Sequence, residues 1–396
     1  MSKERIRIVL KSGKDQSVRR FHPWVFSGAI KKMYGGDPYE GDVVEVYDNK
    51  DNFLALGHYQ VGSIAIRIFS FDDINPDYNF WYSKVKKAYK FRQLTGLIGT
   101  GQTNVYRLIN AEGDGIPGLI IDFYNGTAVM QIHSVGVFRI RNEIVKALKE
   151  IYGERLKAIF DKSGNTMPFK AQTEVKNEHL FGELTNDVVV EHGLKFDVNW
   201  TEGQKTGFFI DQRENRKLLE QYSKDRKVLN MFCYTGGFSV YALNGGAELV
   251  HSVDSSAKAT DLVNKNIGLN FPDAKHESFT VDAFEFLKDV KNKYDLIVLD
   301  PPAFAKHQNV LHNALQGYKR LNQTAIEQIS PGGILFTFSC SQAVSKENFR
   351  KSVFVAAANA NRNVKILHQL TQPVDHPVSI YHPEGEYLKG LVLFVE

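Results

Sequence analysis

The chain has 396 residues, too many for one average domain and suited to two or three. Hydrophobic residues make up 43% and charged residues 24%, which is ordinary for a globular protein in water. No apolar run approaches the roughly 18 residues of a membrane span, and the charged first residues lack the apolar segment of a signal peptide. Two cysteines are too few for a disulfide framework, so we expect a cytoplasmic protein.

The net charge of +4 is unevenly distributed along the chain. Residues 1–33 hold nine basic residues and two acidic ones, a local charge of +7. A basic end on a near-neutral body indicates contact with a polyanion, although a lysine-rich solvated surface explains the charge equally well. The candidates for phosphate contacts are Lys11, Arg19 and Arg20.

Residues 1–75 contain alternating segments typical of short strands, at 5–10, 42–47 and 65–69, which predicts a small β-rich domain. Residues 76–185 predict a middle α+β domain. Its helices are expected at 80–94 and 138–151, its strands at 128–133 and 158–161, and a glycine-rich turn between two apolar strands at 107–122.

From residue 186 to residue 396, predicted strands alternate with helices. Such alternation favours βαβ units, a parallel sheet and ligand binding at the carboxyl ends of the strands. The fold class is therefore α/β, with a third, Rossmann-like domain at 186–396. Strands are predicted at 227–232, 249–254, 278–282, 296–300 and 333–339, and helices at 236–244, 256–268, 283–291 and 311–329.

Four of these strands end in residues that suit a nucleoside cofactor. The first leads into the glycine-containing turn 233–238, where the backbone can approach a ligand at a helix start. The second ends in Asp254, placed to bind ribose hydroxyls, the third in Asp282 and Ala283, beside the adenine edge, and the fourth in Asp300. Each alone could be a turn or a helix cap. The ordered set at one sheet edge favours a binding site.

Other cofactor motifs are missing. The turn after the first strand has Gly236 and Gly237 but not the pattern G-x-G-x-x-G, which argues against a nicotinamide dinucleotide. A P-loop pattern is absent as well. We expect no metal, since the histidines lack the spacing of a standard metal site.

The residues around this edge resemble class I S-adenosylmethionine (SAM) methyltransferases over about 200–396. More specifically, residues 203–213 (GQKTGFFIDQR) and 230–238 (NMFCYTGGF) are similar to the bacterial large-subunit ribosomal RNA (cytosine-carbon-5) methyltransferases that carry an N-terminal PUA domain. Residues 10–28 resemble the start of that PUA module.

The resemblance implies SAM as cofactor, ribosomal RNA as partner and a PUA-like RNA-binding domain at 1–75, and it leaves a homodimer open. It places the segment 203–213 against the cofactor. The implied cofactor-binding residues are Gln204, Thr206, Gly207, Arg213, Phe232, Tyr234, Thr235, Gly236, Gly237, Phe238, Asp254, Ser255, Asp282, Ala283 and Asp300.

Methylation of cytosine carbon 5 needs a nucleophile, because that carbon is unreactive until a thiolate adds to carbon 6. The resemblance gives this role to Cys340, at the end of the strand 333–339; the alternative is a buried structural cysteine. Asp300 is the second catalytic candidate, as a partner of the cytosine amine or ring nitrogen, and the alternative is a turn residue. Cys233 is expected to pack beside the cofactor loop. Lys306 and His307 are candidates for the base that removes the carbon-5 proton.

Two other functions stay open. Residues 300–304 (DPPAF) resemble the motif of amino-group methyltransferases, which need no cysteine, so a guanine or exocyclic-amine methyltransferase is the first alternative. A non-catalytic RNA-binding assembly factor is the second, and the intact acidic set argues against it. Trp24 and Phe26 are expected to form core rather than to stack on bases.

Overall fold

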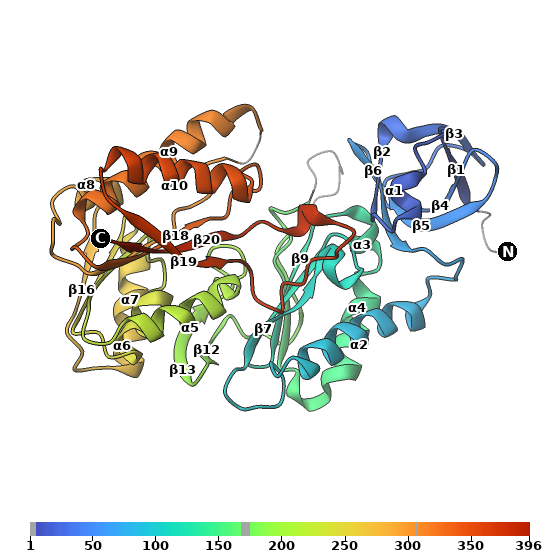
Figure 1. The fold of residues 1–396 in the computed structure, drawn as a ribbon. Coiled ribbons are helices and arrows are strands. Elements are labelled where there is room, and N and C mark those ends of the chain that lie inside the picture. The colour runs from blue at the N-terminus through green and yellow to red at the C-terminus, as the bar shows by residue number, and fades with distance from the viewer. Residues whose placement is uncertain (1–4, 168–174, 306–307) are drawn as a thin grey trace. The chain divides into compact units, whose positions relative to one another are not determined.

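The structure is a computed structural model that describes residues 5–167, 175–305 and 308–396. The chain forms two compact units (Figure 1). Unit 1 comprises Met1–Asp187, Val198–Gly207 and Val374–Gly385, and unit 2 comprises Val188–Asp197, Phe208–Pro373 and Glu386–Glu396. Within the described residues, no helix combines the length and apolar character needed to cross a membrane.

The first sheet of unit 1 has the order β2-β6-β5-β4-β1-β3. Its pairs are antiparallel except β1 with β4, and alternate strand residues such as Ile8, Val44 and Ile66 fill its core. The β-rich domain expected from the alternating segments is thus observed. The elements are β1 (Ile6–Leu10), α1 (Gln16–Arg19), β2 (Trp24–Phe26), β3 (Ile30–Tyr34), β4 (Val43–Tyr47), β5 (Phe53–Tyr59) and β6 (Ile64–Ser70).

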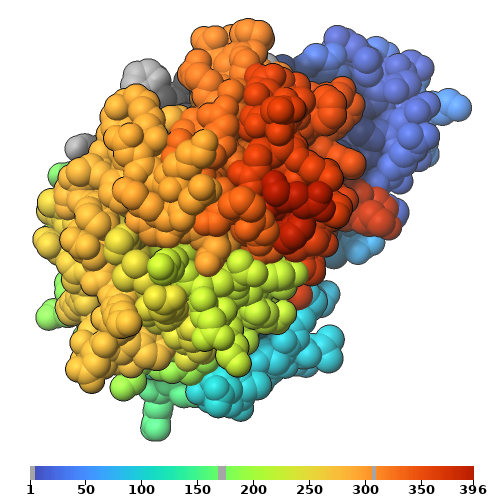
Figure 2. Space-filling model, turned by 60° about the vertical axis from the view of Figure 1, so that its left-hand side comes forward, coloured from blue at the N-terminus to red at the C-terminus, as the bar shows by residue number. Residues whose placement is uncertain are grey.

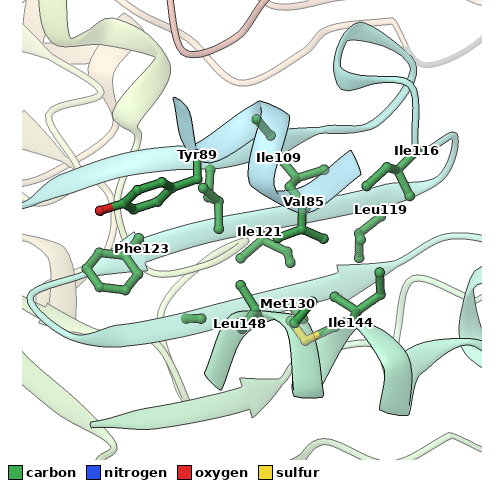
Figure 3. Close-up of a cluster of buried hydrophobic side chains, with 14 of the residues drawn as sticks. Val85, Tyr89, Ile109, Ile116, Leu119, Ile121, Phe123, Met130, Ile144 and Leu148 are labelled. Atoms are coloured by element: carbon green, nitrogen blue, oxygen red, sulfur yellow. The ribbon is translucent and has the colours of Figure 1, made fainter. Parts of the chain in front are cut away.

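The second sheet of unit 1 has the order β11-β10-β9-β8-β7. Figure 3 shows Val85 of α2 and Ile144 of α4 packed with Ile121 and Met130 of the sheet, all of them buried. The expected helices therefore form because their apolar faces cover this sheet. The elements are α2 (Tyr78–Leu94), β7 (Val105–Asn110), β8 (Leu119–Tyr124), β9 (Thr127–Ile132), α3 (Val135–Arg139), α4 (Arg141–Tyr152), β10 (Ala158–Asp161) and β11 (Glu178–Phe181).

Strands β12 (Asn186–Glu191) and β13 (Leu194–Asn199) pair with each other as a separate two-stranded sheet. The short helix η5 (Ile210–Gln212) and helix α5 (Arg213–Tyr222) follow in the chain.

Unit 2 is built on a seven-stranded sheet with the order β16-β15-β14-β17-β18-β20-β19. The first five strands in that order are parallel, and β20 runs antiparallel between β18 and β19. The elements are β14 (Lys227–Met231), α6 (Gly237–Asn244), β15 (Leu249–Asp254), α7 (Ala257–Asn270), β16 (His276–Thr280), α8 (Ala283–Leu287), β17 (Leu296–Leu299), α9 (Leu311–Gln328), β18 (Gly333–Ser339), α10 (Lys346–Asn359), β19 (Val364–Leu370) and β20 (Lys389–Val395).

Successive residues of these strands bury opposite faces of the sheet. Leu229 and Ile297 share a cluster with residues of α8, α9 and α10, whereas Val228 and Val298 share one with residues of α5 and α6. Burial on both faces explains the nearly continuous apolar strands. The outer surface of α9 and α10 is part of the orange region in Figure 2.

A buried ion pair ties β12 to α5 within unit 2. Arg216 donates from Nη2 to Glu191 Oε1 at 2.7 Å and from Nη1 to the carbonyl oxygen of Phe209 at 2.8 Å, and both charged side chains are buried. A Cβ atom added to Gly237 would lie 2.9 Å from Arg216 Cδ, so the arginine also packs against the start of α6.

Removal of the Glu191 charge should therefore destabilise unit 2. We expect Glu191→Gln to lower the free energy of unfolding by about 3 kcal/mol, because it leaves a buried guanidinium without its counter-ion. Urea denaturation followed by circular dichroism measures the loss. The control Glu347→Gln breaks an exposed pair with Lys351 and should cost less than about 1 kcal/mol. Equal costs would contradict the structural role of the buried pair.

Candidate active site

The carboxyl ends of the parallel strands of unit 2 bring three of the predicted site residues to one edge of the sheet. Asp254 ends β15, and Asp300 and Cys340 directly follow β17 and β18. The strand order changes direction between β14 and β17, which is the place where open α/β sheets bind ligands.

The turn after β14 has an unusual backbone. Phe232, Tyr234 and Gly236 have positive φ values of 57°, 45° and 78°, a conformation that costs non-glycine residues of order 1–3 kcal/mol each. A Cβ atom on Gly236 would lie 2.9 Å from Val263, so only glycine fits. The amide of Asn266 donates to the carbonyl oxygen of Thr235 at 2.9 Å and holds the turn.

This turn leads directly into α6, which begins at Gly237 and continues with Phe238. The backbone N–H groups of a helix start, next to the two glycines Gly236 and Gly237, form a cradle for a polar ligand. The turn therefore fits the part of a nucleoside cofactor that the sequence assigned to it.

Asp254 is held in place by the backbone and stays partly exposed. Its Oδ2 accepts from the N–H of Tyr234 at 3.0 Å, and its Oδ1 accepts from the N–H of Ser256 at 3.0 Å. A carboxylate has about four acceptor positions, so these two bonds orient it and leave capacity for a ribose diol. Ser255, the next residue, is exposed.

Asp282 has a second role that the sequence did not separate from binding. Its side chain caps α8 by accepting from the N–H of Glu285 at 3.0 Å, and Ala283 is the buried first residue of that helix. The cap engages one carboxylate oxygen of an exposed side chain. Contact with the adenine edge stays a prediction for these two residues.

The segment 203–213 is divided between the units. Thr206 belongs to unit 1, where its buried hydroxyl donates to Asp122 at 2.6 Å and accepts from Tyr124 at 2.9 Å. Gln204 and Gly207 lie in the same turn, where the N–H of Gly207 donates a hydrogen bond to the carbonyl oxygen of Gln204 at 2.8 Å. Gly207 has a φ of 114°. Their predicted cofactor contacts remain predictions.

Arg213 belongs to unit 2 as the first residue of α5. It is fully buried, and its Nε donates to Glu214 at 3.2 Å. Its predicted cofactor contact likewise remains a prediction.

Asp300 and Cys340 lie on neighbouring turns. The sulfur of Cys340, which is partly exposed, lies 4.0 Å from the carbonyl oxygen of Pro301. Oδ2 of Asp300 accepts from Nε2 of Gln212 at 3.0 Å, and buried Asn215 donates to Gln212 at 2.6 Å. A thiol and an oriented carboxylate thus lie on neighbouring turns at this edge of the sheet.

Cys233 has a different environment. Its side chain is 6% exposed, and burial followed by the Asp254 charge raises the pKa of its thiol. A thiol that stays protonated is a poor nucleophile, in agreement with the expected packing role.

Sequence reasoning missed two features of the site. Gln212 lies in the segment 203–213, but nothing in the sequence identified it as the side chain that orients Asp300. Lys389 was missed because β20 was not predicted, although a single lysine opening an otherwise apolar run is a detectable signal.

The RNA-binding candidates lie in unit 1, and all three are exposed. Arg19 forms ion pairs with Asp15 and Asp48, and the bond to Asp15 is the main reason why its pKa is raised. Lys11 donates to the carbonyl oxygen of Gly28 at 2.9 Å. Arg20 lies at the end of α1.

Trp24 is partly buried and donates to Glu112 at 2.8 Å. The prediction that Phe26 forms core is wrong, because its side chain at the end of β2 is 48% exposed. The base candidates Lys306 and His307 lie outside the described residues.

Comparisons with known proteins agree with this architecture. Residues 8–71 match the model of a PUA-like domain, and residues 164–381 match that of an S-adenosylmethionine-dependent methyltransferase. A solved chain from Streptococcus mutans, described as a candidate SAM-dependent methyltransferase, is 23% identical with a TM-score of 0.83, covering 98% of this chain and 100% of its own. Another candidate methyltransferase, complexed with SAH, is 24% identical with a TM-score of 0.85 and the same coverage. These two share the fold.

Curated relatives match nearly the whole chain. The ribosomal RNA large subunit methyltransferase I of Tolumonas auensis is 40% identical over 395 residues, 98% of each chain. The protein of that name from Escherichia coli is 38% identical over 393 residues, 97% of this chain and 98% of its own. The predicted fold class and SAM dependence are confirmed: the chain belongs to the ribosomal RNA large subunit methyltransferase I family of SAM-dependent methyltransferases.

Proposed function

We propose that this enzyme transfers the methyl group of SAM to carbon 5 of a cytosine in large-subunit ribosomal RNA, with Cys340 as nucleophile. The observation that carries the proposal is the partly exposed Cys340 thiol on the turn next to Asp300, at the edge that also holds the cofactor turn and Asp254. The shared name of the relatives supports ribosomal RNA as the substrate.

Bound SAM supplies an electrophilic methyl group. The Cys340 thiolate adds to carbon 6 of the cytosine, and the electron pair displaced from the ring double bond makes carbon 5 nucleophilic. Attack of carbon 5 on the methyl carbon breaks the methyl–sulfonium bond and releases S-adenosylhomocysteine. The carbon-5 proton then passes to a base, and its electron pair re-forms the ring double bond as the sulfur–carbon bond breaks, which restores the thiolate. Asp300, oriented by Gln212, accepts a hydrogen bond from the cytosine amine and holds the ring against the thiol.

We also propose three domains, at 1–75, 76–185 and 186–396. The enzyme works in the cytoplasm, where ribosomal RNA is found. The basic N-terminal domain binds RNA through phosphate contacts that position the substrate without reading its sequence. The homodimer remains a prediction.

Replacement of the thiol should abolish the reaction without loss of cofactor binding. We expect Cys340→Ala to lower methylation of large-subunit RNA on the order of 10³-fold or more, since the covalent step is lost. Methyl transfer from radiolabelled SAM measures turnover, and isothermal titration measures SAM binding. Cys233→Ala, assayed at saturating SAM, should retain turnover. Normal turnover of Cys340→Ala would favour the exocyclic-amine alternative, and RNA binding without methylation by the unaltered enzyme would favour the assembly factor.

Asp254 should contribute to cofactor affinity through its charge. We expect Asp254→Asn to weaken SAM binding by about 10- to 100-fold, the effect of a lost charge-assisted hydrogen bond of about 1.5–3 kcal/mol. Isothermal titration with SAM measures the change. Asp261→Asn, at an exposed position of α7, is the matched control and should leave the Kd unchanged. An unaltered Kd for Asp254→Asn would remove this carboxylate from the cofactor site.

The basic residues Lys11 and Arg20 should contribute to RNA affinity in a salt-dependent way. Each phosphate contact contributes about 0.7–0.9 to the slope of log K against log salt, so the double alanine variant should have a slope shallower by about 1.5. Fluorescence anisotropy with a labelled RNA across a salt series measures it. Lys351→Ala, which removes a charge paired with Glu347 on α10, is the control. An unchanged slope in the double variant would exclude these contacts.

A further inference from the structure

A buried lysine lies beside the turn that holds Cys340, and it has no role in the reaction proposed above. Lys389 is the first residue of β20 and is 6% exposed. Its Nζ donates to the carbonyl oxygen of Ser341 at 2.7 Å. In the antiparallel pairing of β18 with β20, Lys389 lies opposite Ser339, the residue before Cys340. Strand pairing therefore holds the ammonium group next to the Cys340 turn.

A buried ammonium group is costly unless anionic or polar partners compensate it. The carbonyl oxygen of Ser341 occupies one of its three donor positions. Three ionisable side chains interact electrostatically with Lys389: those of Cys340, Lys346 and Glu386. Glu386 is half exposed and pairs with Lys346 at 2.8 Å, so solvent screens it and its charge is shared.

Two other elements lie near this turn: Asp300 follows β17 and its Oδ2 accepts from Gln212 at 3.0 Å, and α9 contributes Tyr318. Tyr318 of α9 forms a hydrogen bond of 2.9 Å with Ser341 Oγ, and burial raises the pKa of its phenol, so it stays neutral. Of the three side chains that interact with Lys389, Cys340 is therefore the one whose ionisation compensates the buried positive charge of Lys389.

We propose that Lys389 is a positioning residue that stabilises Cys340 as a thiolate ready to attack carbon 6. This inference rests on the proposed role of Cys340. The thiol loses its proton to solvent, Lys389 keeps its own, and the two form an ion pair, with no bond from Lys389 to the substrate. When the sulfur–carbon bond breaks at the end of the reaction, the same ammonium group stabilises the departing thiolate.

The protonation state of Lys389 suits this role. Burial lowers its pKa to about 8, and the electrostatic interaction with Cys340 acts in the opposite direction. The amine is therefore mostly protonated at pH 7. The interaction is reciprocal, so a protonated Lys389 favours the thiolate form of Cys340.

The direct test is the pH dependence of Cys340 alkylation by iodoacetamide in the full-length enzyme, without RNA or SAM. Alkylation requires the thiolate, so the midpoint of the rate profile reports ionisation of the thiol. Mass spectrometry of the Cys340 peptide measures the rate, and the Cys233 peptide reports folding, since that thiol is buried. We expect Lys389→Met to slow alkylation at pH 7 about tenfold, the effect of a midpoint raised by about one unit.

Two further variants separate charge from packing. Lys389→Arg should keep the midpoint of the unaltered enzyme, and Lys346→Met, which removes a half-exposed cation nearby, should not raise it. If Lys389→Met exposes Cys233, Lys389→Gln carries the same prediction. An unchanged profile in the uncharged variant, or an equal shift in Lys389→Arg, would overturn the role of the ammonium charge. The assay needs no methyl transfer, so its failure is distinguishable from failure of Cys340→Ala to abolish turnover.

Discussion

Parallel pairing of β16, β15, β14, β17 and β18 is the constraint on which the site depends. In a parallel sheet every strand ends at the same edge, so residues almost 90 positions apart in the chain reach one edge of the sheet. Asp254 ends β15 and Cys340 follows β18 for this reason. A slip of one residue would move every strand side chain to the opposite face, where it would meet helices that pack against other side chains.

The edge divides into two chemical halves. On the β14–β15 side, a strained turn and a carboxylate held by two backbone N–H groups form a preorganised polar cradle. On the β17–β18 side lie an oriented carboxylate and a partly exposed thiol, to which we assign the target base. In our proposal the first half holds the cofactor and the second half determines the choice of cytosine carbon 5. Lys389 is brought to the second half by the pairing of β20 with β18.

Sequence patterns predicted most of this architecture, because strong periodicity and turn chemistry both acted locally. The predicted strand 249–254 and the predicted strand 333–339 agree with β15 and β18 residue for residue. The patterns missed β19, β20 and α10. The antiparallel return of the chain to pair with β18 is a long-range event that no local alternation of strand and helix announces.

Side-chain roles were less predictable than elements. Asp282 caps α8 by accepting from the N–H of Glu285, a role separate from the predicted contact with the cofactor. Thr206 donates a hydrogen bond to Asp122, which lies 84 positions away in the chain. Arg19, at the end of α1, forms an ion pair with Asp48, which directly follows β4. In each case the side chain's partner depends on tertiary packing, which residue type and spacing do not encode.

The central claim is that Cys340 forms a covalent bond to carbon 6 of the target cytosine. Fluorine at carbon 5 replaces the proton that must leave, so an adduct formed on 5-fluorocytosine RNA in the presence of SAM cannot resolve. The account predicts a stable protein–RNA complex whose cross-linked peptide contains Cys340, and none with Cys340→Ala. Methylation of ordinary RNA without any trapped complex, or a cross-link elsewhere in the chain, would contradict it.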